Sequence, residues 1–476
     1  MGVLGHDTHG DASADFTPPV VSLDTELPYA PFSELQKAII IAIVTAIALA
    51  NPLALDMYYP SLLTIRDELG TTQSGITWTI TAFFMTVAIT PMVWSNLADQ
   101  IGRKPVYLVA MAIYAAGSIG CALSQSLPVL VVSRIVQACG SSVGQGSGAG
   151  IITDIYPRDQ RGMALGFYFL GVLIGPNIGP PVGGLIGEHA GWRWVFWTHA
   201  IIAGVLLLVV AVGLPETHRR IVAEKHPIQP INIPPRLGIR DNNPLLDICL
   251  LRYPVVAMAI LNAGILYSTN IINVTSQPQV YESVYGLSQG VTGICMLGSG
   301  AGLVLGSLCG GRVTDLLIRR HRRKLTANVE DSEQATPVPV PPETRMRAMW
   351  VGGVPVLCGF VAWGWMVEHK VHLGATLAVQ FVLGFGLLFT AQAVWAYLID
   401  VFPGRSARAF SVQSFSRGML GAAMAQALPA MKENIGWGWT YTVVFFLALL
   451  ALLTSQVVTS KGGWLRNRYG PHITPE

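Results

Sequence analysis

Three charged side chains lie inside long apolar stretches of the sequence, where a charge is costly and usually has a function. Asp56 closes the apolar stretch 37–58 and is followed by Tyr58 and Tyr59. A carboxylate shielded from water can accept a proton near physiological pH, so Asp56 is our candidate proton carrier. The alternative is a hydrated, permanently ionised Asp56 at the membrane surface.

The other two intramembrane charges are arginines. Arg134 lies about 10 Å into its apolar stretch at 1.5 Å per residue, with Gln137 one helical turn away. It could take part in proton coupling, bind a substrate anion or tie helices together. Arg417 lies about 14 Å into the eleventh stretch, near the membrane midplane and beside Gln413. A guanidinium there can hold an anionic substrate through paired hydrogen bonds, or it can bond to neighbouring carbonyls.

Further polar and aromatic side chains could complete a substrate cavity. Asn270 and Asn273 follow Tyr267 in the seventh apolar stretch, and Gln392 and Trp395 lie in the tenth. Such groups hydrogen-bond to or stack on ligands. They serve equally well as hydrogen bonds between membrane helices, so both roles remain open.

The elements that must position these residues are membrane-spanning helices. Only 12% of the 476 residues are charged, whereas a soluble protein carries about 25%. A span needs roughly 20 mostly apolar residues. Twelve such stretches occur, at 37–58, 75–95, 105–124, 127–152, 162–186, 193–214, 252–274, 289–313, 347–367, 373–398, 407–430 and 438–459.

The basic residues orient these spans. With both termini in the cytoplasm, 24 of the 30 lysines and arginines fall on the cytoplasmic side and four on the outside, as the positive-inside rule requires. We therefore expect a disordered cytoplasmic tail (1–36), an N-terminal bundle of six helices (37–214), a linker (215–251), a C-terminal bundle of six helices (252–459) with a cytoplasmic loop at 314–346, and a C-terminal tail (460–476).

The two halves repeat one charge pattern. An acid precedes a base by four residues after the second and eighth spans, and another acid ends the fourth and tenth spans. The acids and bases concerned are Asp99, Arg103 and Asp154 in the first half, and Asp315, Arg319 and Asp400 in the second. The predicted fold class is therefore an all-α membrane protein of twelve transmembrane helices in two pseudo-symmetric six-helix bundles, with a substrate site between them.

The fifth span is unusually rich in glycine and proline. Prolines remove backbone donors and bend a helix, and glycines let a neighbouring helix, expected from the other half, approach closely. The residues that define this pattern are Gly175, Pro176, Gly179, Pro180, Gly183 and Gly184.

Several motifs resemble a known family. The segment from Asp99 to Lys104 resembles the major facilitator loop motif, with Ser95 and Gln100 replacing its usual Gly and Arg. Arg134 with Gln137, and the glycine–proline pattern, resemble the twelve-span drug:proton antiporters. The segments 192–197, 214–217 and 416–421 resemble the fungal branch of quinidine-resistance and dityrosine transporters, and the resemblance covers roughly 37–460.

The resemblance implies a major facilitator fold and a cytoplasmic gate formed by the repeated acids and bases. Arg103 is expected to meet Asp154, and Asp99 to lie at a helix N-terminus of the other half, holding the cytoplasmic side closed in the outward-facing state. It also implies a secondary active transporter that exports drugs, weak organic acids or metabolites by alternating access in exchange for protons. The alternative is an organic-anion exchanger or uniporter, for mono- or dicarboxylates, that uses the intramembrane arginines.

Other classes of protein fit the sequence poorly. It has no phosphate-binding G-x-x-x-x-G-K-[ST] loop, no metal-ligand cluster and no nucleophile with a base, so we expect neither ATP hydrolysis nor an enzyme. We expect no cofactor and no nucleic-acid partner. The predicted partners are a small-molecule substrate, protons and the lipid bilayer, for a monomer in the plasma membrane, with a vacuolar or other internal membrane as the alternative.

Overall fold

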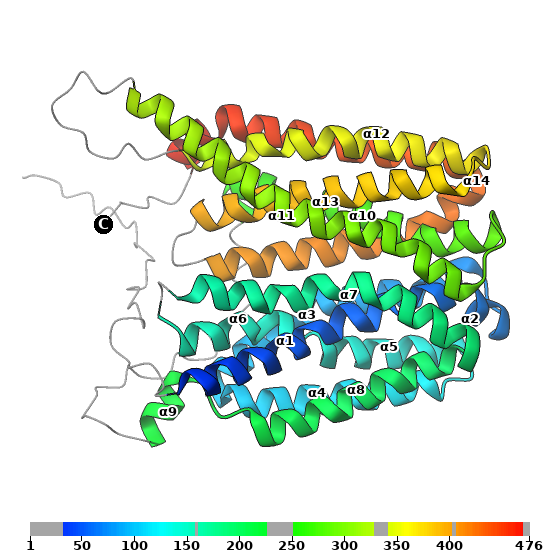
Figure 1. Cartoon of the computed structure of the whole chain (residues 1–476), viewed down its shortest axis with the longest axis horizontal. Helices are drawn as coiled ribbons and strands as arrows, with labels where there is room; N and C mark the ends of the chain where they lie inside the picture. Colours follow the sequence, from blue (N-terminus) through cyan, green and yellow to red (C-terminus); the bar gives the residue numbers. More distant parts are fainter. Residues whose placement is uncertain (1–31, 158–159, 226–250, 328–340, 402–405, 470–476) are drawn as a thin grey trace, which may run out of the picture.

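A computed structural model of the chain describes residues 32–157, 160–225, 251–327, 341–401 and 406–469. These residues form helices that run side by side along the long axis of the molecule (Figure 1). The first half contains α1 (Glu34–Asp56), η1 (Tyr59–Ser61), α2 (Leu62–Glu68), α3 (Gln73–Ile101), α4 (Arg103–Ala122), α5 (Leu127–Ser141), α6 (Val143–Ile155), α7 (Arg161–Ala190) and α8 (Trp192–Gly213), followed by the short α9 (Arg219–Lys225). The second half contains α10 (Pro254–Ser283), α11 (Gln289–Ala327), η3 (Pro342–Ala348), α12 (Met349–Glu368), α13 (Leu373–Val401) and α14 (Ser406–Tyr469).

The described residues contain 11 helical segments long and apolar enough to cross a membrane. The last of them spans 54 residues and holds two crossings, because Gly436 breaks α14 with a non-helical φ of 74° and ψ of 178°. A left-handed φ of this kind favours glycine. Twelve crossings result, which confirms the predicted all-α fold class.

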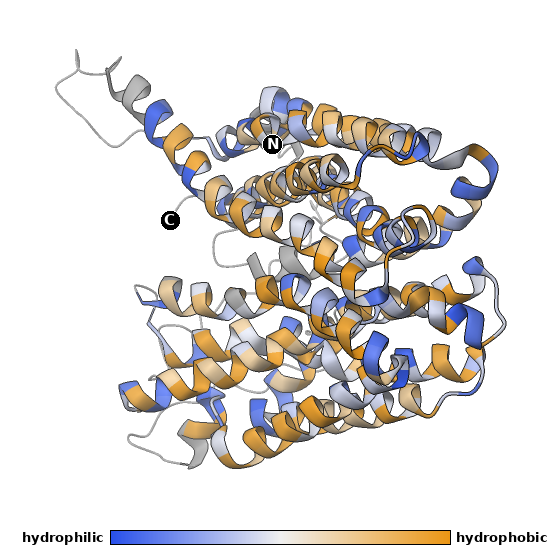
Figure 2. Ribbon diagram, turned by 45° about the vertical axis from the view of Figure 1, so that its right-hand side comes forward, coloured by the Kyte–Doolittle hydropathy of each residue, from blue (hydrophilic) through white to orange (hydrophobic). Residues whose placement is uncertain are grey.

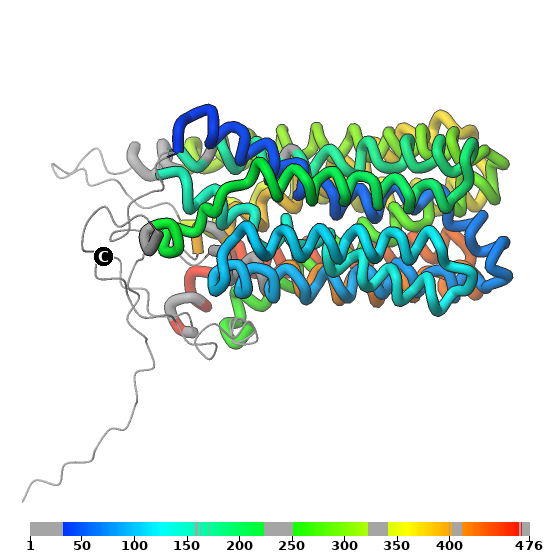
Figure 3. The backbone as a smooth tube through the Cα atoms, turned by 90° about the horizontal axis from the view of Figure 1, so that it is seen from below, coloured from blue at the N-terminus to red at the C-terminus, as the bar shows by residue number. Residues whose placement is uncertain are grey.

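The crossings form two bundles, α1–α8 and α10–α14, which lie beside one another in Figure 1 and overlap in the view of Figure 3. The bundles meet where α7 packs on α11 and where α3 packs on α14. Hydrophobic residues run along most of the helices (Figure 2), and large apolar residues such as Val212, Met163 and Leu208 are exposed. Such a surface suits contact with lipid rather than water.

Two loops differ from the boundaries expected above. Helix α11 continues to Ala327, and η3 begins at Pro342, so both ends of the expected loop 314–346 are helical. Helix α1 begins at Glu34, where Ser33 caps it by accepting a hydrogen bond from the Gln36 amide. Residues 1–31, 226–250 and 470–476, on which most of the expected tails and linker fall, lie outside the described residues.

Helix α7 runs without interruption through Pro176, Pro180 and Pro181. Its glycines make one face so flat that α1 packs directly against it. A Cβ atom added at Gly175 would lie 2.5 Å from Pro52, and one at Gly179 would lie 2.8 Å from the Asp56 Cβ. The glycines were expected to face the other half, but Gly175, Gly179 and Gly183 face α1 of their own half.

The opposite face of α7 does meet the other half. A Cβ atom at Gly184 would collide with the Gln289 backbone of α11, and one at Gly293 of α11 would collide with the Pro180 backbone. The expectation of close contact with the other half therefore holds for Gly184 and Pro180. Helix α7 is thus packed tightly on both sides.

We predict that Gly183→Val destabilises the protein, because the added side chain would collide with the Met57 backbone. Overpacking of this kind typically costs about 1–3 kcal/mol. Gly166→Val on the same helix is the matched control, since a Cβ there meets nothing within 4 Å. The apparent melting temperature in detergent should fall for Gly183→Val alone, and equal melting of the two variants would contradict this account of the α1–α7 contact.

Candidate functional site

Asp56 lies at the end of α1 and is 6% exposed. The close packing of α1 on Gly179 of α7 holds it in place. It lies within electrostatic reach of Tyr59 in η1 and of Tyr267 in α10, which belongs to the other bundle. No ion pair to Asp56 is found within the described part of the chain.

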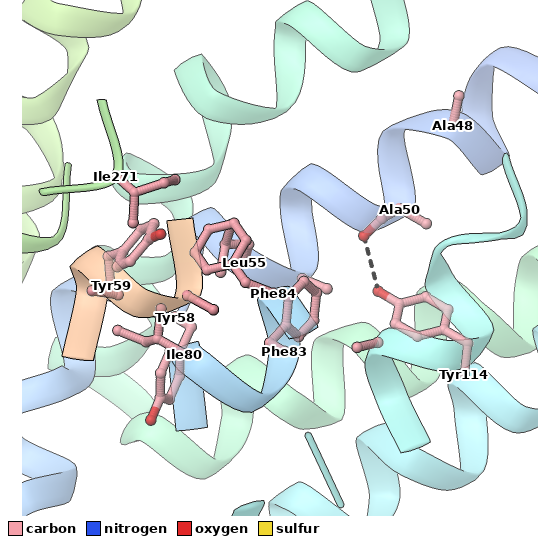
Figure 4. Close-up of a cluster of buried hydrophobic side chains, with 14 of the residues drawn as sticks. Ala48, Ala50, Leu55, Tyr58, Tyr59, Ile80, Phe83, Phe84, Tyr114 and Ile271 are labelled. Carbon is pink, nitrogen blue, oxygen red and sulfur yellow. Dashed lines mark hydrogen bonds between the residues drawn. The ribbon is translucent and has the colours of Figure 1, made fainter. Parts of the chain in front are cut away.

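Arg134 in α5 is fully buried and ties α5 to α1. Its Nη1 donates to the Ala54 carbonyl oxygen at 2.8 Å and to Gln137 Oε1 at 2.7 Å. The guanidinium lies 4.5 Å from the Tyr58 ring centroid and 4.4 Å from that of Phe83. Figure 4 shows these two rings in the buried cluster at the end of α1.

Arg134 therefore bonds to the backbone two residues before Asp56 and makes no ion pair with the Asp56 carboxylate. Its Nε and Nη2 have no hydrogen-bond partner within the described residues. Cation–π contacts with the Tyr58 and Phe83 rings stabilise the charge instead. Gln137 in turn donates to Ser118 of α4 at 3.0 Å. Arg134 and Gln137 thus anchor the segment that carries Asp56.

Arg417 lies half-buried in α14, and its guanidinium is 4.2 Å from the Tyr267 ring centroid and 5.9 Å from that of Trp395. Tyr267 also meets the Phe84 ring of α3 edge-on at 6.1 Å, across the boundary between the bundles. Gln413, one turn from Arg417, is 1% exposed, and neither atom of its amide has a partner among the described residues. Tyr267 thus contacts Arg417 within its own bundle and Phe84 across the boundary between the bundles.

The remaining predicted cavity residues are placed differently. Asn273 exchanges two hydrogen bonds with Gln380 of α13, at 2.9 and 3.0 Å, and therefore ties α10 to α13. Gln392 donates to Ser307 of α11 at 2.8 Å. Asn270 is half-buried, one turn from Tyr267. Asn273 and Gln392 thus form hydrogen bonds between helices of their own bundle.

The predicted cytoplasmic cluster of the first half is present. Arg103, the first residue of α4, pairs with Asp99 at 2.8 Å and with Asp154 at 3.0 Å. Glu216 caps the same helix by accepting hydrogen bonds from the backbone amides of Arg103 and Lys104, at 2.9 and 3.2 Å. The expected contact of Asp99 with a helix of the other half stays a prediction, because residues 402–405 before α14 lie outside the described residues.

His218 lies beside this cluster, outside the membrane-spanning segments. Its burial, and then the positive charge of Arg103, lower the pKa of His218 below its usual range. Neither Glu216 nor His218 is among the site residues predicted from the sequence. A helix that begins with two basic residues and no capping side chain of its own is the signal that could have led to Glu216.

In the second half, Arg345 takes the place expected for Arg319. Arg345 lies in η3 and pairs with Asp400 at 2.5 Å and with Asp315 at 3.5 Å. Arg319 is exposed on α11 and forms no ion pair with a described residue. The reason is the longer connection between the eighth and ninth spans, which places the base 30 residues after its acid instead of four.

The described hydrogen bonds between the two bundles gather at the end opposite these clusters, which the charge bias assigns to the outside. Gln426 of α14 bonds to Thr81 at 3.1 Å and to Ser74 at 2.9 Å. Gln289 of α11 bonds to Thr64. At the cytoplasmic end, the described ion pairs join residues of the same bundle only. The described hydrogen bonds thus join the two bundles at this end.

No group of three or more His, Cys, Asp and Glu side chains in the described ranges could hold a metal ion. The site is instead an aromatic and polar cluster around Tyr267, with an acid from one bundle and a guanidinium from the other.

The chain is similar in sequence to fungal transporters. The chain is 27% identical over 460 residues to the MFS-type transporter phiD of a fungal species, which covers 91% of this chain and 69% of that protein. It is 26% identical to the MFS-type transporter tstD of Talaromyces stipitatus, over 89% of this chain and 82% of that protein.

Solved structures show the same fold. A D-xylose–proton symporter superposes with a TM-score of 0.68 at 13% identity, covering 89% of this chain and 97% of the symporter. A bacterial homologue of the human lysosomal transporter Spinster, in an inward-facing conformation, gives a TM-score of 0.63 at 14% identity, over 92% and 98% of the two chains. The sequence model of the Major Facilitator Superfamily matches residues 44–426, and the chain belongs to that superfamily.

Proposed function

We propose that this transporter exports small organic molecules by alternating access, in exchange for protons. The observation that carries the proposal is the position of Asp56, a buried carboxylate without an ion pair among the described residues, next to the Tyr267 contact between the bundles. Protonation would remove its charge. A ligand or proton that changes the charge there shifts the balance between the two conformations.

The contacts between the bundles support one conformation of an alternating-access cycle, the one closed to the outside. The outer end is joined by hydrogen bonds, whereas each cytoplasmic cluster is closed within its own bundle. An outward-facing state would require these outer hydrogen bonds to break. We also propose that the protein works as a monomer in the plasma membrane, and that it carries drugs, weak organic acids or related metabolites.

We predict that Asp56→Asn abolishes transport driven by a pH gradient, because the amide cannot bind or release a proton near neutral pH. Transport should be measured in sealed vesicles carrying the purified protein, with an imposed pH gradient and labelled cations, neutral drugs and carboxylates. Exchange of labelled for unlabelled substrate at equal pH should survive, since that exchange requires no proton movement.

Asp67→Asn is the matched control, because Asp67 is an exposed carboxylate at the outer end. It should keep the pH-driven uptake. Uphill transport that persists in Asp56→Asn would show that the proton is carried elsewhere.

The alternative function, organic-anion exchange or uniport, has its own observation. Arg417 lies over two aromatic rings and is held by no ion pair to a described carboxylate, so its charge is available to an anion. A planar guanidinium can bind a carboxylate through two hydrogen bonds, whereas lysine offers only a point charge.

We predict that Arg417→Gln lowers carboxylate transport at least tenfold and that Arg417→Lys restores it only in part, because a charge-assisted hydrogen bond is worth about 1.5–3 kcal/mol. Cationic and neutral substrates should be affected much less. The measurement is initial uptake of each labelled class, normalised to the amount of folded protein. Equal loss of all classes would make Arg417 a structural or coupling residue.

We predict that Arg345→Gln slows transport severalfold, because it leaves Asp315 and Asp400 as neighbouring carboxylates without their shared cation. Arg319 is an exposed arginine at the same end of the molecule. The transport rate of Arg319→Gln should stay within about twofold of that of the unmodified protein, because surface charges contribute little. Initial rates at saturating substrate distinguish the two variants. If Arg319→Gln slowed transport more than Arg345→Gln, Arg319 and not Arg345 would be the base of the cytoplasmic gate.

A further inference from the structure

Glu188 makes an uncommon contact between the two bundles. It lies in the last turn of α7, at the outer end of the molecule, and is exposed. Its Oε2 accepts a hydrogen bond from the backbone amide of Gly290 at 2.6 Å and one from the Ser288 hydroxyl at 2.9 Å. Ser288 and Gly290 flank Gln289, the first residue of α11, so a side chain of one bundle caps a helix of the other.

The chemistry of this contact is favourable in two ways. The first amides of a helix have no partner within that helix, and the helix dipole places positive potential there. A carboxylate supplies both an acceptor and a negative charge. Among the described hydrogen bonds that join the two bundles, those to Glu188 involve a charged side chain, whereas those of Gln289 and Gln426 are neutral.

The approach depends on a glycine. A Cβ atom at position 290 would stand 2.5 Å from Glu188 Oε2. Any other residue would push the carboxylate away from the α11 amide. Since the carboxylate is the free end of a flexible side chain, it could move aside without disturbing the helices. The Cβ would also stand 3.2 Å from Leu185 Cδ2 of α7, so all three of its nearest atoms belong to the side chains of Glu188 and Leu185, and Gly290→Ala would displace side chains rather than backbone.

We propose that Glu188 is a positioning residue for transport: it holds the outer ends of α7 and α11 together and favours the conformation closed to the outside. When the bundles separate at their outer ends, α11 loses its cap and the carboxylate returns to water. The contact therefore stabilises one conformation of the cycle and not the other. This inference rests on alternating access, but not on proton coupling or on any particular substrate.

The experiment measures conformation directly, so it does not depend on the transported molecule. Spin labels on Gln125→Cys and Asn434→Cys, both exposed at the outer ends of opposite bundles, report opening as a longer distance in a background without the native cysteines. In Glu188→Gln we expect the ratio of outward-open to outward-closed molecules to rise roughly two- to fivefold, the range for one charge at a helix N-terminus.

Gly290→Ala should give the same shift without altering Glu188 itself, and Ser288→Ala a smaller one, since it keeps the backbone bond. The double variant Glu188→Gln, Gly290→Ala should shift no further than either single variant, because both remove one contact. Two changes that merely loosened the fold would instead add together.

Glu433→Gln and Gly298→Ala are the matched controls. Glu433 is another exposed carboxylate at the outer end, and a Cβ at Gly298 of α11 would make only an ordinary contact of 3.6 Å. Neither should change the distance distribution. An unchanged distribution in Glu188→Gln, or additive shifts in the double variant, would overturn the proposal. If the distance shift is found but the unmodified protein shows no uptake driven by a pH gradient, the result counts against proton exchange and not against the role of Glu188.

Discussion

The backbone of α7 lies so close to α1 on one face and to α11 on the other that side chains at the contact positions would not fit. Membrane helices gain little from burying apolar surface against one another, because lipid is equally apolar, so close backbone packing supplies much of their association. At Gly175 and Gly179 this packing fixes the end of α1 and therefore the position of Asp56. At Gly184 it joins the two bundles. One helix thus determines both where the acid lies and how the halves meet.

The three intramembrane charges are accommodated in different ways. Arg134 is surrounded by a carbonyl, an amide and two aromatic rings, which together replace water around a permanent cation. Arg417 rests on the rings of Tyr267 and Trp395 and stays half-buried. Among its described contacts, Asp56 has no ion pair that would stabilise a charge on its carboxylate. Of the three, it is also the group that can lose its charge by taking up a proton, whereas an arginine cannot.

Much of the fold could be predicted from the sequence because its signals are local. The apolar stretches, the basic loops and the four-residue spacing of Asp99 and Arg103 each depend on neighbouring residues. The structure departs from expectation where a partner is distant in the chain. Asn273 could not be recognised as a helix tie because Gln380 lies 107 residues away. Arg345 was missed because the longer loop moved the base away from Asp315, while the basic pair at Arg319 kept the spacing without the contact.

The two ends of the molecule are held by different kinds of interaction, and the difference bears on how it moves. At the cytoplasmic end, Arg103 and Arg345 each join two carboxylates within one bundle, so these strong contacts can persist while the bundles separate. At the outer end, the described polar contacts between bundles are hydrogen bonds on amide, hydroxyl and carboxylate groups, which water can replace at modest cost. The described ion pairs at the cytoplasmic end therefore hold each bundle together, whereas the described polar contacts at the outer end join one bundle to the other. That arrangement suits rigid-body motion of one half against the other, because the ion pairs inside each bundle need not break when the hydrogen bonds between the bundles do.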